Sequence, residues 1–283
     1  MNYDKLNDII IYWFGTNSDK NLWFQSDKNK KEEIDKYICE NFKDVLTYLE
    51  LQLKSSLVKD FIDRKNLDLK KTDGKKKCRL RNIPKLDDAN FAGTAKSPKC
   101  TLIVVEGDSA RTFANSGLSV IGHDYYGVFP LKGKPLNVRE ASAIQQGNNS
   151  EISYIKQILG LQMDKKYDNP KDLKSLRYGS LMILTDADDD GTHIKGLIIN
   201  MFHYWWPELL KVNGFLKSMI TPVVKITKKK KSIDFRTVYE YNQWKNQHNI
   251  NGWKIKYYKG LGTSTSNEAK EYFQQIDSNQ IFY

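Results

Sequence analysis

The sequence predicts an α/β fold in which a parallel sheet of about four strands carries helices on both faces, with a helical segment ahead of it. Two continuous apolar runs, at 100–105 and 181–184, have the character of strands buried in a parallel sheet. Each run ends in acidic residues and a glycine, and a helix is expected after each of them. This repeated order of strand, acidic end and helix is the plan of an α/β domain.

The composition narrows the class of protein. The 283 residues suit one or two domains, and 40% hydrophobic residues can bury a proper core. There is no apolar run of about 18 residues and the polar start does not resemble a signal peptide, so we expect no membrane span. Cys39, Cys78 and Cys100 lie far apart without CxxC spacing, which favours a reducing compartment and argues against zinc. A net charge of +11 favours a polyanionic partner such as nucleic acid.

Residues 1–53 are predicted to form a helical segment. Apolar residues between 6 and 14 form one stripe, and a second helix is expected over about 30–53. The stretch Ile11-Tyr-Trp-Phe-Gly15, with Leu22-Trp-Phe24 after it, resembles the start of the all-helical bacterial DUF924 family. We interpret the segment as unrelated to, or fused with, the domain behind it.

Residues 54–98 form a basic, loop-rich lead-in, with a lysine-rich run over 70–81. A charge run of this kind is a solvated face or linker, or it contacts phosphates ahead of the following domain. The stretch by itself leaves both interpretations open.

The strand at 100–105 ends in Glu106-Gly-Asp-Ser-Ala110, and a helix is expected from Arg111. Gly107 permits a close backbone approach. If this strand lies beside the strand at 181–184, Glu106 faces the acidic residues at the end of the second strand.

A basic turn lies between the two strands. Lys132, Lys134 and Arg139 crowd a turn built by Gly133 and Pro135. Alone it is a solvated loop, but beside a carboxylate site it suits the backbone of a nucleic acid.

The second strand runs into Asp186, Asp188, Asp189 and Asp190 before Gly191. Carboxylates two residues apart point the same way in an extended chain, and their repulsion is relieved by a hard cation such as Mg²⁺. A solvated turn is the simpler alternative. An EF-hand calcium loop fails, because its twelfth position is Leu197 instead of Glu and a strand precedes it.

The remaining elements follow in order. The helix after the aspartates should close before Pro207, and a strand is expected through 215–225. A surface hairpin or loop at 228–231 and a strand at 253–257 come next. Lys259 stands beside flexible glycines, and Ser264 or Ser266 should cap a helix that buries Tyr272 and Phe273.

Four motifs in this order resemble the Toprim domain of type IIA DNA topoisomerases, in the eukaryotic and large-virus form. They are Glu106-Gly-Asp-Ser-Ala110, Pro130-Leu-Lys-Gly-Lys-Pro-Leu-Asn-Val-Arg-Glu-Ala141, Asp186-x-Asp188-x-Asp190-Gly-x-His193-Ile-Lys-Gly196 and Tyr258-Lys-Gly-Leu-Gly-Thr263. The resemblance runs from about residue 54 to 283 and implies a Rossmann-like Toprim sheet. We therefore expect three parts: the helical segment 1–53, the lead-in 54–98 and a Toprim domain at 99–283.

The resemblance also implies roles for single residues. Magnesium, as two ions, would be held by Glu106, Asp186, Asp188 and Asp190, with Asp189 a bystander. Glu106 and Lys259 would be catalytic, Glu106 as general acid and base at the ribose 3′ oxygen. The expected DNA contacts are Lys132, Lys134, Arg139, His193 and Lys259, with His193 as a bracing residue in the alternative.

The family's ATPase domain and its domain with the nucleophilic tyrosine have no counterpart in this sequence, so ATP would act only through a missing domain. We expect part of an ATP-dependent enzyme: a fragment, a split subunit or a truncated reading frame. Its partners would be double-stranded DNA and the remaining domains, as a homodimer, in the nucleus or a viral factory or cytoplasm. A non-catalytic DNA-binding remnant is the alternative. A primase or nuclease fits poorly, because those Toprim enzymes lack the second and fourth motifs.

Overall fold

The structure is a computed structural model that describes residues 69–283 except 78, 81, 164 and 230. The chain divides into two compact units, Met1–Arg64 and Lys65–Tyr283, and the description concerns the second unit. The helices predicted for 1–53 and the stretch that resembles DUF924 lie outside the described residues. Among the helices of the described part, none is long and apolar enough to cross a membrane.

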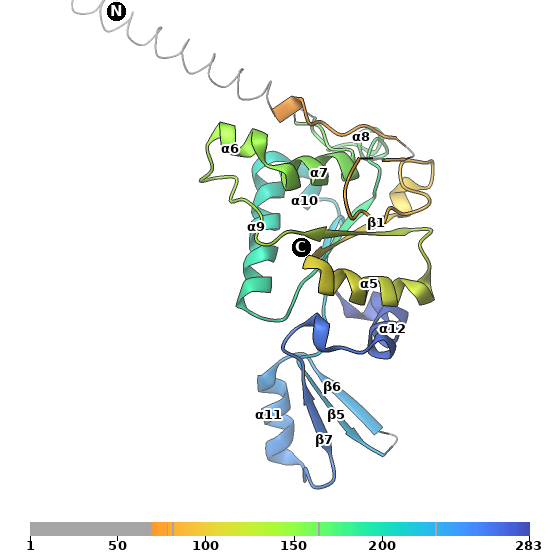
Figure 1. The fold of residues 1–283 in the computed structure, drawn as a ribbon, viewed down its shortest axis with the longest axis vertical. Coiled ribbons are helices and arrows are strands. Elements are labelled where there is room, and N and C mark those ends of the chain that lie inside the picture. The colour runs from red at the N-terminus through yellow and green to blue at the C-terminus, as the bar shows by residue number, and fades with distance from the viewer. Residues whose placement is uncertain (1–68, 78, 81, 164, 230) are drawn as a thin grey trace, which may run out of the picture. The chain divides into compact units, whose positions relative to one another are not determined.

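A five-stranded sheet A forms the centre of the unit (Figure 1). Its order is β2-β1-β3-β4-β8, in which the first four strands are parallel and β8 runs antiparallel at one edge. The predicted α/β fold with a parallel sheet of about four strands is thereby confirmed. The strands are β1 (Thr101–Glu106), β2 (Tyr126–Leu131), β3 (Ser180–Leu184), β4 (Leu216–Met219) and β8 (Gln280–Phe282).

Helices cover both faces of sheet A because the side chains of each strand alternate between two apolar clusters. On one face Ile103 and Val105 pack with α5 (Gly107–Ile121) and α12 (Ser266–Gln274). On the other face Leu102 and Val104 pack with α7 (Ser150–Leu159) and α9 (Asp189–Trp205). The shorter helices are α6 (Ala143–Asn148), α8 (Pro170–Leu173) and α10 (Pro207–Leu210), with 3₁₀ turns η1 (Ser97–Lys99), η2 (Leu261–Thr263) and η3 (Ile276–Asn279). Tyr272 and Phe273 are buried, as predicted.

A second, three-stranded antiparallel sheet B has the order β6-β5-β7. It consists of β5 (Val224–Lys228), β6 (Lys231–Phe235) and β7 (Lys254–Tyr257), and α11 (Val238–Gln247) belongs to the same region. The hairpin expected at 228–231 and the strand expected at 253–257 are both confirmed here.

The strand expected over 215–225 was wrong as a single element. The chain leaves sheet A after Met219 and enters sheet B at Val224. Pro222 lies between the two strands and has no N–H to donate to a ladder. The amide of Ile220 donates to Asn279, next to β8, and the amide of Val223 donates to Phe235 of β6. The linking residues are therefore hydrogen-bonded to both sheets.

Several predicted boundaries also shift. Helix α5 begins at Gly107, four residues before the expected Arg111, and Gly107 has φ +76°, a region that favours glycine. Helix α12 is capped by Thr265, not by Ser264 or Ser266, because Thr265 forms a reciprocal capping box with Glu268. Helix α9 ends before Pro207, as expected. Strand β2 was not predicted, since Pro130 interrupts its pattern, but an end strand tolerates proline.

The lead-in is packed against sheet A over its last third. Asp87 forms an antiparallel bridge to Val128 of β2, and its carboxylate accepts two hydrogen bonds of 2.8 Å from Arg111. Asp88 accepts hydrogen bonds from the buried Arg177 and from Tyr178. These contacts hold the residues before β1 in a fixed position beside the carboxyl end of β2.

Candidate metal and DNA site

The carboxyl end of sheet A brings the two acidic strand ends together. Strands β1 and β3 are direct neighbours, with Val105 paired to Leu184. Glu106 comes one residue after this pair on β1, and Asp186 comes two residues after it on β3. Burial, and then the charges of Asp186, Asp188 and Asp190, raise the pKa of Glu106. Its Oε2 atom is buried and has no hydrogen-bond partner in the described part of the chain. The expected meeting of the two strand ends is therefore confirmed.

Asp186 is fixed by the segment that follows β7. Its Oδ1 accepts a hydrogen bond of 2.8 Å from the backbone N–H of Leu261. A Cβ atom on the preceding Gly260 would lie 2.3 Å from Oδ2 of Asp186. Only a residue without a side chain permits this close approach, which places Lys259 one residue from the contact.

The other aspartates differ in their surroundings. Asp188 caps α9 by accepting a hydrogen bond of 2.8 Å from Gly191. Asp190 lies in the first turn of that helix and forms an ion pair of 2.8 Å with Lys134. This hydrogen bond lowers the pKa of Asp190 and raises the pKa of Lys134. Asp189 is exposed in the same turn.

The segment from Asp186 to Asp190 is not extended throughout, as the expectation for the three aspartates assumed. The reason is that α9 begins at Asp189, so Asp190 belongs to a helical turn. No group of three or more His, Cys, Asp or Glu side chains in the described part is close enough to hold a metal ion.

The residues nevertheless suit a hard cation in their chemistry. All four carboxylates supply the oxygen ligands that Mg²⁺ prefers. Glu106 presents a buried oxygen that has no hydrogen-bond partner among the described residues, and burial together with three neighbouring negative charges raises its pKa. A bound cation would relieve both features.

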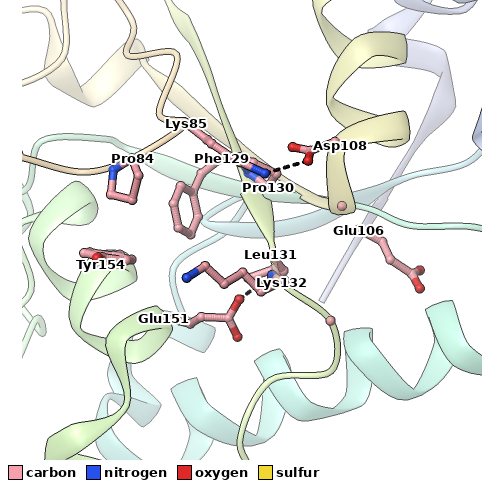
Figure 2. Close-up of a pocket in the computed structure, with 12 residues that line it drawn as sticks. Pro84, Lys85, Glu106, Asp108, Phe129, Pro130, Leu131, Lys132, Glu151 and Tyr154 are labelled. Atoms are coloured by element: carbon pink, nitrogen blue, oxygen red, sulfur yellow. Dashed lines mark hydrogen bonds and ion pairs between the residues drawn. The ribbon is translucent and has the colours of Figure 1, made fainter.

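A cavity of about 600 Å³ lies beside this acidic edge (Figure 2). Its lining includes Glu106 on one side, and Lys132, Glu151 and Tyr154 on the other. The backbone N–H of Lys132 donates to Glu151, and the Lys132 side chain is exposed. Lys85 also lines the cavity and forms an ion pair of 2.5 Å with Asp108.

Arg139 is held by α9. Its guanidinium donates to Asn200 over 2.6 Å, lies 2.7 Å from Nδ1 of His203 and sits over the ring of Tyr204. His193, on the first turns of α9, and Lys259 are both exposed. The predicted DNA contacts thus come from three segments around the acidic edge: the turn after β2, α9 and the loop after β7.

Sequence reasoning missed the contributions of Gly260, Leu261 and Lys85. The spacing Gly260-Leu-Gly262 hinted at a close backbone approach, but not at which group would be approached. No sequence pattern indicated that Lys85 would lie at the site, because its position depends on the packing of the lead-in.

A parallel sheet with acidic residues at the carboxyl ends of two adjacent strands is the arrangement that the Toprim resemblance implies, and comparison with known families agrees. Residues 101–219 match the family model of the Toprim domain, and residues 219–283 match that of the C-terminal associated domain of TOPRIM. The chain therefore contains a Toprim domain followed by its associated domain.

Relatives of known name specify the kind of Toprim domain. DNA topoisomerase 2 of Bombyx mori is 54% identical over 244 residues, which are 86% of this chain and 15% of that protein. The Drosophila melanogaster enzyme is 56% identical over 217 residues. A crystal structure of the Plasmodium falciparum topoisomerase II DNA-binding, cleavage and re-ligation domain matches 72% of this chain and 28% of its own, with 56% identity and a TM-score of 0.69.

The Toprim-containing region of this chain is homologous to that of type II DNA topoisomerases. The resemblance drawn from the four motifs is confirmed. The chain spans about 15% of the length of the curated relatives it matches.

Proposed function

We propose that this chain supplies the magnesium-binding half of the DNA cleavage and religation site in an ATP-dependent type II topoisomerase. The proposal rests mainly on Glu106, whose buried oxygen finds no hydrogen-bond partner in the part of the chain that the structure describes and lies near the charges of three aspartates. The strand pairing that sets this arrangement is a property of the fold, because β1 and β3 are adjacent.

Two magnesium ions would be held by Glu106, Asp186, Asp188 and Asp190. When bound, such ions neutralise charge that develops on the oxygens around the reacting phosphorus. The Leu261 amide orients Asp186 for this role, and Asp190, now paired with Lys134, would be the fourth ligand.

The protein's own side chains supply the remaining functions. Glu106 would act as general acid and base at the ribose 3′ oxygen, and Lys259 would contact the phosphate that is bonded to this oxygen. Lys132, Lys134, Arg139 and His193 would contact the duplex backbone. None of the tyrosines in this sequence is assigned as the nucleophile, so cleavage would require the partner domains of the family, as a homodimer acting on double-stranded DNA. The proposed compartment is the nucleus, or a viral factory or the cytoplasm for a viral source.

Calorimetric titration with Mg²⁺, with and without nicked duplex DNA, tests the metal site. The informative variant is Asp186→Asn/Asp188→Asn, because asparagine keeps the size of each side chain and still caps a helix. Asp189→Asn is the matched control in the same turn. We expect Mg²⁺ binding that DNA strengthens, that the double variant loses and that the control keeps.

The same titration separates the proposal from the non-catalytic alternative. Equal Mg²⁺ binding in the wild type and the double variant would refute the assigned ligands. DNA binding without any Mg²⁺-dependent signal would identify the chain as a DNA-binding remnant.

A further inference from the structure

Sheet B and α11 form a separately packed part of the unit, residues 223–260, called the basic arm here. Val224, Ile226, Phe235 and Tyr241 are its buried core, with partly buried side chains packed around them. In Figure 1 the basic arm extends beyond α12, at the opposite end of the unit from α6, α7 and α8. A core of its own gives the surface residues of the arm fixed positions.

The two faces of sheet B differ in chemistry. Helix α11 packs on the apolar face, where Tyr241 contacts the ring of Phe235. The opposite face is polar, since β5 and β7 alternate between the faces in register. Its members are Lys225 and Thr227 on β5, Ser232 and Asp234 on β6, and Lys254 and Lys256 on β7.

Helix α12 neutralises only the base of this polar face. Lys225 forms an ion pair of 3.0 Å with Glu271, and Lys256 forms one of 2.7 Å with Glu268. Farther out, Lys254 is exposed. Lys229 and Lys231, at the turn between β5 and β6, are exposed as well. Among the described residues, no ion pair joins any of these three outer lysines to an acidic side chain.

The charge of the chain is concentrated in this arm. Residues 223–260 contain ten Lys or Arg and two acidic residues, a net charge of +8 out of the +11 of the whole sequence. A lysine also occupies φ +53° at position 229, in a hairpin turn where Gly or Asn is normally preferred. The turn therefore keeps a charged residue at some cost in backbone strain.

We propose that the basic arm binds the phosphate backbone of duplex DNA at a surface separate from the cleavage site. Lys254 is paired with Thr227, and Lys231 with the neighbouring Lys228, so Lys254 lies at the same end of sheet B as Lys229 and Lys231. Neighbouring strands lie about 5 Å apart, so these three lysines can reach nearby phosphates of one duplex. Trp244 and Trp253 pack on each other in the apolar cluster and take no part in the contact. The contact that the outer lysines make with phosphates is electrostatic and independent of sequence.

Lys229, Lys231 and Lys254 are not among the residues assigned to the cleavage site, although Lys259 at the end of the arm is. Binding by these three outer lysines therefore does not depend on the proposed metal chemistry. Fluorescence anisotropy of an intact duplex of about 20 base pairs, with EDTA present and over about 50–200 mM salt, tests it without metal. The arm variant is Lys229→Gly/Lys231→Gln/Lys254→Gln, in which glycine relieves the turn. Lys99→Gln/Lys171→Gln/Lys211→Gln removes the same charge from exposed positions outside the arm.

We expect the arm variant to bind both of two unrelated duplex sequences more weakly. Its plot of log Kobs against log salt should be shallower by about 3, close to one unit for each lost phosphate contact. A slope that equals that of the control variant overturns the proposal. So does an arm variant that binds DNA normally but loses binding to anionic vesicles or to an acidic protein. Failure of the Mg²⁺ titration would refute the metal site and leave this slope unchanged.

Discussion

Replacing Gly260 with alanine should damage the metal site while leaving the fold almost intact. The new Cβ would lie 2.3 Å from Oδ2 of Asp186, whereas ordinary contacts begin near 3.4 Å, so the carboxylate must move by about 1 Å. The φ angle of Gly260 is −176°, which alanine adopts without strain. The movement breaks the 2.8 Å hydrogen bond from Leu261 to Asp186. A hydrogen bond to a charged group contributes about 1.5–3 kcal/mol.

The corresponding loss of Mg²⁺ affinity is about 10- to 100-fold, which is also the usual effect of removing a residue that orients a metal ligand. Calorimetry with nicked duplex DNA measures it, alongside a thermal melt in EDTA. Gly196→Ala is the matched control, because beyond its own stretch of helix no described atom lies within 4 Å of the added Cβ. Affinity within about twofold of the wild type for Gly260→Ala would refute the idea that this close approach positions Asp186.

The remaining predictions concern stability. Burial opposes ionisation of Glu268, but hydrogen bonds from Lys256, Thr265 and Tyr258 prevail and lower its pKa from 4.5 to about 2. The stabilisation from ionised Glu268 is complete above pH 4.5 and is lost as the pH falls through 2. Glu268→Gln should therefore lower the free energy of unfolding by up to about 3 kcal/mol at pH 7, and by about 2 kcal/mol less at pH 3. Urea unfolding at the two pH values measures the difference. An equal cost at both pH values would contradict it. The raised pKa of Glu106 has the opposite sign, because its ionised form destabilises the fold. In EDTA, Glu106→Gln should therefore raise Tm by a few degrees at pH 7, and this gain should shrink as the pH falls. A lower Tm would contradict the idea that burial and the neighbouring aspartates destabilise the ionised Glu106. Arg177→Met should cost about 3–5 kcal/mol in chemical denaturation, because the fully buried Arg177 pairs with Asp88 over 2.6 Å; a cost below about 1 kcal/mol would mean that water replaces this pair.

Local patterns predicted the fold class and the acidic edge. The apolar runs of β1 and β3 can satisfy both faces of a sheet only when buried between helices, and the acidic residues at their ends must then share one edge. Strand β2 escaped prediction because Pro130 is acceptable only at an end strand, and the sequence does not state the strand order. The single strand expected over 215–225 failed for a related reason, since its two halves pair with different sheets.

The sequence by itself determined the fold class and which residues are candidates for the chemistry, because apolar periodicity, charge and glycine placement are local properties of the chain. Tertiary structure alone decided how those residues meet. The approach of Gly260 to Asp186 joins positions far apart in the chain. The pairing of Lys134 with Asp190 likewise depends on α9 beginning at Asp189. The basic arm shows the same division: its lysines are evident in the sequence, but the pairing of β5 with β7 and the ion pairs from α12 decide which of them remain open to a partner.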